Sequence, residues 1–528
     1  MKNICILDST LRDGAQSEGI SFSLEDKLKI VKALDDLGVG IIEAGNPGSN
    51  PKDLEFFSRV KMLDLKNSKI AAFGSTRRKG VLAEDDKNLQ SLLDAQVDII
   101  VFFGKCWDFH VTDIIQTSLE ENLDMIKQTA AFFKERGKEV IFDAEHFFDG
   151  YKENPDYAIS CLKAAADGGT GCVVLCDTNG GVFPREAFEI TKAAASAVPV
   201  RIGIHCHNDC GMADANTVLA VEAGAGHVQG TVTGFGERCG NASLSAAIPN
   251  LQIKMGFSCI KEENLQKLTQ TARLISEIAN VWLSERQPYA GRSAFSHKGG
   301  MHIDAVVKNP RSYEHIDPER VGNVRKLLTS EVAGRSTILA KIQRLSPGIS
   351  KDSPETEAVI KRLKELEYQG YQFEGAESTF ELVIRKELGK YKPLFELVNF
   401  KIVGEQPYEE GSSATAMIKI KVDGMTEITA AEGDGPVNAL DKALRKALEV
   451  FYPQIASLRL TDYKVRVMDS KSATASSVRV LIETTDGVDS WTTVGVSKDI
   501  IEASWIALVD SVEYKLIKDI EIKFKAYL

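Results

Sequence analysis

The chain has 528 residues, enough for about three domains of roughly 150 residues each, and its hydrophobic content of 43% is ordinary for a soluble globular protein. Its 64 basic and 75 acidic side chains give a net charge of −11 without any Lys/Arg tract, which argues against nucleic acid as a main partner, and no apolar run approaches the roughly 18 residues of a membrane helix. Nine cysteines, all between Cys5 and Cys259 and without a C-x-x-C pair, and a strand-like start without a signal peptide predict a cytoplasmic enzyme with reduced thiols.

The first part of the chain alternates short apolar runs with helical patterns. The apolar runs cover residues 4–7, 39–42, 70–73, 97–102, 140–142, 172–175, 200–204 and 227–232. Eight strand–helix units in about 250 residues predict a (β/α)8 (TIM) barrel. The alternative is an open doubly wound sheet built from the same units. It is disfavoured by the count of eight, and because residues 8–14 read DSTLRDG where such a sheet would carry G-x-G-x-x-G.

Polar and charged residues follow nearly every predicted strand. The carboxyl ends of the strands in such a barrel meet at one mouth, where the chemistry gathers. The residues at these ends are Asp8, Arg12, Asp13, Glu43, Asp143, Glu145, His146, Asp177, Thr178, His205, His207, Thr231, Thr233 and Asn241. Any one of them could be a helix cap, but so large a collection at one end indicates a functional site.

The seventh run, residues 201–209, reads RIGIHCHND and carries two histidines two residues apart. Side chains alternate faces along a strand, so His205 and His207 are predicted on one face and Ile202, Ile204 and Cys206 on the other. This pattern indicates a metal site at the end of a barrel strand. The alternative is a pair of histidines that merely end a strand, each bonded to a carbonyl or to water.

Two neutral imidazoles and a carboxylate are a common three-point set for a divalent cation with open coordination positions. Asp13 is the best carboxylate, because it follows the first strand and has Arg12 beside it. The Asn241 amide is a further candidate ligand. Manganese, zinc, cobalt and magnesium all stay open, since these residue types do not decide among them.

An open-sided metal beside an arginine suits a 2-oxo acid, whose ketone a metal polarises as a Lewis acid. Arg12 can add a charge-assisted contact to the developing oxyanion, and Thr178 can hydrogen-bond the substrate carboxylate. If the attacking carbon comes from a thioester, a base must take a proton from its methyl group. Glu145 and His302 are the candidates for that base or its supporting partner.

Residues 256–390 lose the strand–helix rhythm, and helical patterns dominate. An irregular stretch at residues 293–313 carries His297 and His302, and its Gly-Gly pair predicts a turn. We interpret this region as a helical extension that reaches over a barrel mouth. The alternative is a linker with incidental histidines, which composition alone favours.

Residues 391–528 form a third unit with an internal repeat. Two copies of a strands-then-helix pattern predict a pseudo-symmetric α+β module with antiparallel sheets. A loop of small or polar residues precedes each helix, at residues 433–436 and 495–497. The exposed amides at these helix starts could hold the carboxylate of a small effector. That these loops are merely turns and caps is an equally good interpretation.

Four motifs occur in order along the chain: LRDGAQ at 11–16, HCHND at 205–209, GERCGNASL at 236–244 and HKGGMHIDAV at 297–306. Together they resemble the metal-dependent Claisen-condensing synthases, the family that holds 2-isopropylmalate, homocitrate and citramalate synthases. The resemblance covers essentially the whole chain. It implies a catalytic barrel at residues 1–255, a helical subdomain with the His302 loop at 256–390 and an amino-acid-sensing regulatory domain at 391–528.

The resemblance also implies a metal and substrate site in the barrel. Its metal ligands would be Asp13, His205 and His207, with Asn241 at or next to the coordination shell. Arg12 and Thr178 would bind the 2-oxo acid.

For catalysis, the resemblance implies that Glu145 and His302, assisted by Tyr313, deprotonate acetyl-CoA as the co-substrate. Water would then hydrolyse the thioester and release CoA. The His302 loop of this family reaches the active site of the partner subunit, which implies a homodimer.

The chain departs from the isopropylmalate synthase pattern in two places. That group usually carries Glu after RDG, where this chain has Ala15, and its fifth strand usually ends Ser-x-Glu, where this chain has Asp143, Ala144 and Glu145. The stretches FDAEHFFDGYKENPDYA and LCDTNGG look like the longer citramalate synthase subtype. We therefore expect pyruvate, acetyl-CoA and water to give citramalate and CoA, an entry to isoleucine, with isoleucine as the feedback effector. A charged Asp143 beside the pocket would also favour a small 2-oxo acid.

Three alternatives stay open. The first is a 2-isopropylmalate synthase, which uses 2-oxoisovalerate. The second is a carbon–carbon lyase like 3-hydroxy-3-methylglutaryl-CoA lyase, although the duplicated C-terminal module speaks against it. The third is a non-enzymatic, metal-stabilised dimer that binds an effector.

Overall fold

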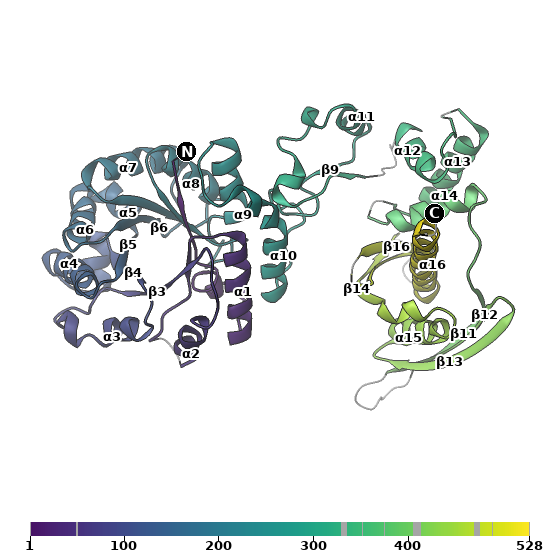
Figure 1. The fold of residues 1–528 in the computed structure, drawn as a ribbon, viewed down its shortest axis with the longest axis horizontal. Coiled ribbons are helices and arrows are strands. Elements are labelled where there is room, and N and C mark those ends of the chain that lie inside the picture. The colour runs from purple at the N-terminus through teal and green to yellow at the C-terminus, as the bar shows by residue number, and fades with distance from the viewer. Residues whose placement is uncertain are drawn as a thin grey trace. The chain divides into compact units, whose positions relative to one another are not determined.

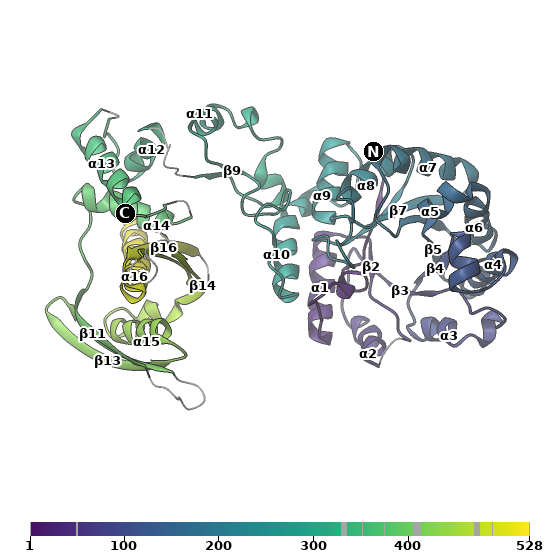
Figure 2. The ribbon, with the colours of Figure 1, turned by 180° about the vertical axis from the view of Figure 1, so that it is seen from behind.

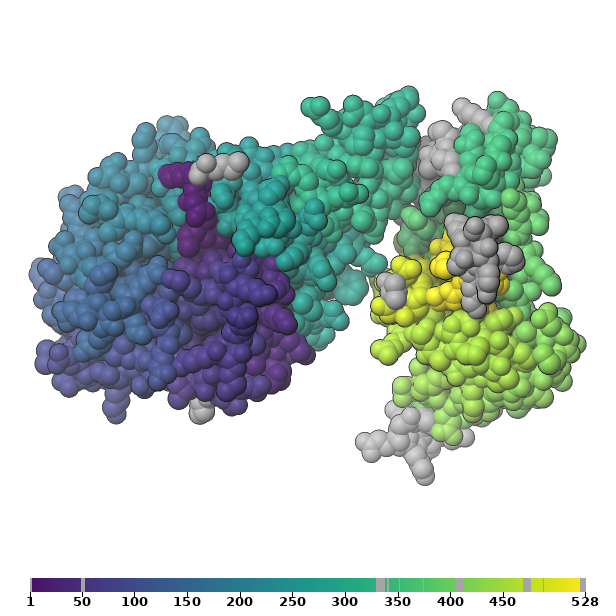
Figure 3. All heavy atoms as spheres, in the orientation of Figure 1, coloured from purple at the N-terminus to yellow at the C-terminus, as the bar shows by residue number. Residues whose placement is uncertain are grey.

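The computed structural model describes residues 2–48, 51–328, 335–350, 352–373, 375–404, 413–468, 476–487 and 489–526, and Figure 3 draws the other residues in grey. The chain divides into two compact units. The first comprises Met1–Phe295 and His315–Arg325, and the second comprises Ser296–Glu314 and Lys326–Leu528. The domain boundaries expected at residues 255 and 390 stay predictions. Within the described residues, no helix combines the length and the apolar content that crossing a bilayer requires.

The first unit is built on a closed parallel barrel (Figures 1 and 2). Its strands are β1 (Cys5–Asp8), β2 (Ile41–Glu43), β3 (Lys69–Ser75), β4 (Ile99–Lys105), β5 (Glu139–Glu145), β6 (Cys172–Asp177), β7 (Arg201–Cys206) and β8 (His227–Gly230). Each strand pairs in parallel with the next, and β1 also pairs with β8, which closes the sheet. The predicted (β/α)8 barrel is therefore confirmed.

Helices surround the barrel in both views of the ribbon. They are α1 (Leu24–Leu37), α2 (Pro51–Val60), α3 (Lys87–Asp94), α4 (Leu119–Glu135), α5 (Phe147–Glu153), α6 (Pro155–Asp167), α7 (Pro184–Ala197), α8 (Ala213–Glu222), α9 (Leu244–Pro249) and α10 (Leu268–Ile278). Local chemistry sets their ends. Helix α1 starts at a capping box between Ser23 and Asp26 and ends at Gly38, which adopts the left-handed conformation with φ of 94°.

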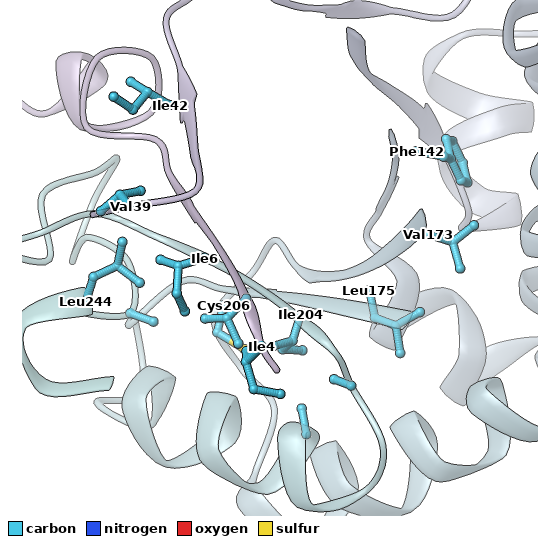
Figure 4. Close-up of a cluster of buried hydrophobic side chains, with 14 of the residues drawn as sticks. Ile4, Ile6, Val39, Ile42, Phe142, Val173, Leu175, Ile204, Cys206 and Leu244 are labelled. Carbon is cyan, nitrogen blue, oxygen red and sulfur yellow. The ribbon is translucent and has the colours of Figure 1, made fainter. Parts of the chain in front are cut away.

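Outward-facing strand side chains make the layer between the barrel and its helices. Figure 4 shows part of this layer, including Ile6 of β1, Phe142 of β5, Val173 of β6 and both Ile204 and Cys206 of β7. The alternation predicted for the seventh strand is therefore confirmed on its apolar face.

Inward-facing side chains form a separate apolar cluster inside the barrel, with Leu7, Ile41, Ile99, Ile141 and Val174 among its members. Ile41, Ile99, Ile141 and Val174 lie in the first half of their strands, and Leu7 is the third of the four residues of β1. Apolar side chains therefore fill the barrel interior, and the polar inward-facing groups occur near the carboxyl ends of the strands.

The stretch at residues 293–313 is more regular than we predicted. It contains β9 (Ser296–His297), which pairs with β10 (Lys326–Leu327), and then helix α11 (Gly300–Lys308). Ile303 and Val306 are buried one turn apart on this helix, and that spacing is what helix packing needs. The prediction of an irregular segment was wrong here, because the Gly-Gly pair begins a helix and does not break one.

Three further helices of the second unit pack together. They are α12 (Arg335–Leu345), α13 (Pro354–Tyr368) and α14 (Glu377–Glu387). Their shared core includes Ile342, Val359, Leu363, Phe380 and Ile384. The predicted helical character of the region after the barrel is confirmed.

The C-terminal part repeats one motif twice, as predicted. The first copy is β11 (Glu396–Gly404), β12 (Ala414–Val422), β13 (Met425–Gly433) and α15 (Pro436–Glu449), and the second is β14 (Arg459–Val467), β15 (Val478–Thr485), β16 (Ser490–Ser497) and α16 (Ile500–Ala526). Both sheets are antiparallel, with the strands in chain order. The first strand of each copy has a register shift near its start, between Leu397 and Asn399 and between Leu460 and Asp462. One core holds apolar residues from both copies.

Candidate active site

Asp13, His205 and His207 come together at the mouth of the barrel. His205 is in β7, His207 follows its last residue, and Asp13 lies in the loop after β1. The Nε2 atoms of His205 and His207 lie 3.7 and 3.9 Å from Asp13 Oδ2. Two metal–ligand bonds of about 2.1 Å span up to about 4.2 Å, so one ion fits between these atoms. Among the described residues, Asp13, His205 and His207 form the group of possible metal ligands whose ligand atoms all lie within 4.8 Å of one another.

Gln229 of β8 orients the His205 ring. Its Oε1 accepts a hydrogen bond from His205 Nδ1 at 2.9 Å, and its Nε2 donates to Asp143 Oδ1 at 2.9 Å. Because the amide oxygen only accepts, the proton of His205 lies on Nδ1, and the lone pair of Nε2 faces Asp13. This is the usual support of a metal-binding histidine by a neighbouring polar group.

Asn241 completes the donor set. Its Nδ2 donates to Asp13 Oδ1 at 2.9 Å and to the carbonyl of Phe235 at 3.1 Å. Its Oδ1 is buried and accepts no hydrogen bond from any residue that the structure describes. A buried acceptor without a donor suits a cation nearby, so these residues fit a divalent metal.

Arg12 also holds the Asp13 carboxylate, at the same oxygen that faces the two imidazoles. Its Nη1 donates to Asp13 Oδ2 at 2.7 Å and its Nε to Glu43 Oε2 at 2.6 Å. The guanidinium also lies 3.9 Å from the centre of the Phe73 ring. Ser9 donates to Glu43 as well, at 2.5 Å. Arg12 is therefore held rigidly, with most of its surface buried.

The electrostatics of the cluster favour the metal-binding protonation states. Burial opposes the charge of Asp13, but Arg12, the two imidazoles and Asn241 outweigh it and hold the Asp13 pKa below its usual range. Burial lowers the pKa of His205 to about 4 and also lowers the pKa of His207. At neutral pH the site is thus one carboxylate and two neutral imidazoles, the forms that ligate a cation.

Asp143 is not the charged group beside the pocket that the sequence suggested. It is buried, and burial together with Glu43 raises its pKa to about 8. The argument for a small substrate from a charged Asp143 therefore does not hold.

Thr178 follows β6, and its hydroxyl is oriented by the neighbouring loop. Its Oγ1 accepts the backbone N–H of His146 at 2.9 Å. Since that contact uses an acceptor position, the hydroxyl hydrogen remains to donate to a ligand. His146 has a φ of 56°, an uncommon value for a residue other than glycine, and follows Glu145 directly.

Glu145 ends β5 and forms an ion pair with Lys105, its neighbour across the sheet at the end of β4. Lys105 also lines a pocket of about 660 Å³ between the loop after β3 and helix α4. The walls are largely apolar and include the side chains of Val81, Phe103, Ile115 and Met125. The cationic residues Arg77, Arg78 and Lys79 also line the pocket. A long, partly apolar molecule with anionic groups suits such a pocket.

His302 and Tyr313 lie together in the second unit. Their rings stack with centres 4.0 Å apart and planes 24° from parallel, and both side chains are exposed. Next to them in the chain, His297 is buried with its Nε2 3.1 Å from Glu314 Oε1. The structure thus separates a surface pair, His302 and Tyr313, from a buried histidine with a structural partner.

Sequence reasoning named Asp13, His205, His207, Asn241 and Arg12, and the structure brings these five together. It missed Gln229 and Lys105. One signal for Gln229 was available, because period 2 places residues 227 and 229 on the same face of β8. Lys105 could be found only from strand register, which places it opposite Glu145.

Comparisons with known proteins cover nearly the whole chain. The family model described as HMGL-like matches residues 3–275, the homocitrate synthase post-HMGL domain-like model matches 290–370, and the LeuA allosteric (dimerisation) domain matches 374–516. The chain is 50% identical to the (R)-citramalate synthase of Aquifex aeolicus (strain VF5), over 98% of this chain and 99% of that protein. It is also 50% identical to the (R)-citramalate synthase of Geobacter sulfurreducens, over 99% of each chain. The 2-isopropylmalate synthase of Methanocaldococcus jannaschii is 30% identical, over 98% of this chain and 95% of that protein.

Proposed function

The chain belongs to the (R)-citramalate synthases of the HMGL-like family, and we propose that it condenses acetyl-CoA with pyruvate and water to give citramalate and CoA. One observation carries this proposal: two relatives of that name are 50% identical over nearly the full length of both chains. The cluster of Asp13, His205 and His207 at the barrel mouth supports it, because the reaction needs a polarised ketone.

The 2-oxo acid would bind beside this cluster. Asp13, His205 and His207 would hold a divalent cation, with Asn241 as a further ligand. When bound, such a cation acts as a Lewis acid toward the ketone of the substrate.

Two further groups would bind the substrate carboxylate and stabilise the negative charge that develops on the ketone oxygen. Thr178 donates its remaining hydroxyl hydrogen to the carboxylate of pyruvate. Arg12 is fixed by Asp13 and Glu43 and offers positive charge where the ketone oxygen becomes negative.

Glu145 would act as the base. Its carboxylate takes a proton from the methyl group of acetyl-CoA, and the resulting carbanion forms a bond to the ketone carbon of pyruvate. The π bond of the ketone breaks as this bond forms, and its oxygen takes up a proton to become the hydroxyl group of the product. Water then cleaves the thioester and releases CoA as a thiol. We assign His302 and Tyr313 to this proton transfer as well, in line with the family resemblance.

Acetyl-CoA would occupy the pocket beside Lys105. Its pantetheine arm suits the apolar walls, and its phosphates suit the cations around them. Lys79 is the best of these cations, because among the described residues its Nζ contacts the backbone carbonyls of Ile115 and Gln116 and no carboxylate.

We further propose a cytoplasmic homodimer that isoleucine inhibits as the end product of its pathway. The match to an allosteric (dimerisation) domain supports the dimer and the effector site. The loops before α15 and α16, at residues 433–436 and 495–497, are the proposed contacts for the effector carboxylate.

The test is release of free CoA, followed with a thiol reagent in the presence of acetyl-CoA, a divalent metal and one 2-oxo acid at a time. We expect fast release with pyruvate and slow release with 2-oxoisovalerate. Faster release with 2-oxoisovalerate would instead identify a 2-isopropylmalate synthase. Cleavage of a 3-hydroxyacyl-CoA without any condensation would identify a lyase, and no thiol under any condition would leave a binding protein.

A further inference from the structure

The loops that follow β6, β7 and β8 lie against one another at the barrel mouth. They carry Thr178, His207 and Asn241, three of the proposed site residues. Two backbone hydrogen bonds join them, from Asn208 N to the Gly240 carbonyl at 2.9 Å and from Cys210 N to the Gly180 carbonyl at 3.0 Å.

The side chain of Arg238 connects all three loops. Arg238 belongs to the loop after β8. Its Nε and Nη2 donate to the two carboxylate oxygens of Asp209 at 2.8 and 2.9 Å, and Nη2 also donates to the Thr178 carbonyl at 2.8 Å. One guanidinium thus holds the residue two positions after His207 and the backbone of Thr178 itself.

The local backbone is shaped for this contact. Arg238 has a φ of 55° and Gly180 a φ of 62°, both in the left-handed region that favours glycine. A Cβ atom on Gly180 would lie 2.3 Å from Asp209 Oδ2, so any other residue there would push the carboxylate away. The guanidinium of Arg238 therefore holds Asp209, and Gly180 leaves the space that the carboxylate occupies.

The same loop is anchored toward β1 as well. Ser17 donates its hydroxyl to the Gly236 carbonyl at 2.6 Å and accepts from Gly236 N at 2.7 Å. Ser17 lies four residues after Asp13. The loop after β8 is thereby tied to the loop of Asp13 on one side and to the loops of Thr178 and His207 on the other.

We propose that Arg238 is a positioning residue that sets the spacing between the metal ligands and the group that binds the substrate carboxylate. Its hydrogen bonds end on Asp209 and on a backbone carbonyl, so it acts through His207 and Thr178. The expected effect on substrate binding rests on the proposed function, whereas the expected effect on metal affinity does not. An ordinary surface ion pair contributes little to stability. A bidentate arginine–carboxylate pair whose guanidinium also donates to a backbone carbonyl restrains the positions of the groups that it joins.

Three variants and one control test this role on the full-length protein. Arg238→Gly removes the guanidinium and keeps a residue that accepts the left-handed backbone, and Arg238→Lys keeps the charge but loses the fork. Asp209→Asn keeps the shape of the partner without its charge. The control is Arg185→Ala, which breaks an exposed arginine–glutamate pair on α7 with Glu189.

The first readout is manganese affinity, measured by calorimetry on protein stripped with a chelator. We expect the dissociation constant to rise about 10-fold or more in Arg238→Gly and Arg238→Lys and to stay unchanged in Arg185→Ala. The second is steady-state kinetics, where we expect a pyruvate KM at least about 10-fold higher and a smaller change in kcat. A merely structural role would lower the melting temperature and leave the metal affinity of the folded protein unchanged.

Metal affinity within twofold of wild type in both arginine variants would overturn the proposal. So would additive effects of Arg238→Lys and Asp209→Asn in the double variant, since groups that work as one pair are not additive. If Arg238→Gly does not fold, Arg238→Lys decides the outcome. If the wild type releases no CoA from acetyl-CoA with any 2-oxo acid, the proposed function fails while the metal titration still tests Arg238.

Discussion

Replacing Gln229 with methionine tests whether a side chain behind the proposed metal site sets the metal affinity of that site. Methionine has a similar volume and no hydrogen-bonding amide. The change removes the acceptor of His205 Nδ1 and one donor to Asp143, both at 2.9 Å and both buried. The His205 ring is then free to rotate and to move its proton to the other nitrogen.

The size of the effect follows from these two contacts. Each lost bond leaves a buried polar group, which costs about 1–3 kcal/mol, so the free energy of unfolding of the metal-free protein should fall by about 2–6 kcal/mol. Losing the partner of a ligating histidine typically weakens metal binding by about 10–100-fold. That range corresponds to about 1.4–2.7 kcal/mol of binding free energy.

The assay combines a manganese titration of the stripped protein with urea unfolding in the presence of a chelator. A matched control is Asn323→Leu, because Asn323 is a buried amide that donates to the carbonyls of Tyr289 and Gly291 at 2.8 and 2.9 Å. We expect the control to lose stability and keep its metal affinity. If Gln229→Met binds manganese within twofold of wild type, the reasoning about the His205 tautomer is refuted.

Three further predictions concern catalysis, pH and regulation. His302→Ala should lower kcat by roughly 10²–10⁴-fold without changing the metal content, and a variant that loses metal would show that the role of His302 is misassigned. Burial raises the pKa of Asp8 from its ordinary value of 3.8 to about 7, so the folded state binds this proton more tightly than the unfolded chain does. The stability from Asp8 is therefore fully present below about pH 4 and is lost as the pH rises to about 7, and urea unfolding of Asp8→Asn should show a smaller loss across that window than wild type. A chain that ends at Lys390 keeps the core shared by α12, α13 and α14 and should no longer respond to isoleucine, whereas retained inhibition would place the effector site elsewhere.

Local patterns in the sequence were enough to predict the barrel and the cluster of Asp13, His205 and His207. The alternation of His205 and His207 with Ile204 and Cys206 is visible within one strand, and period 2 places each set on its own face. The position of Asp13 follows from the rule that strand ends meet at one mouth. These inferences do not require knowledge of contacts between residues that are far apart in the sequence.

The supporting contacts could not be predicted in the same way. Gln229 is 24 residues from His205 and Arg238 is 60 residues from Thr178, and neither residue type signals its partner. The state of Asp143 depends on its burial and on Glu43, which are properties of the folded barrel. For the same reason α11 was missed, because the burial of Ile303 and Val306 decides that the glycine pair starts a helix.

The four proposed ligands are held in two different ways, and this difference predicts where the site is most easily weakened. His205 lies within β7, where neighbouring strands and Gln229 fix it. Asp13, His207 and Asn241 lie outside the strands, so their positions depend on contacts between loops. Loops open at lower free energy than barrel strands do, so small losses in those contacts should reach the metal first. Changes at the loop anchors should therefore weaken metal binding at temperatures where the barrel itself is still folded.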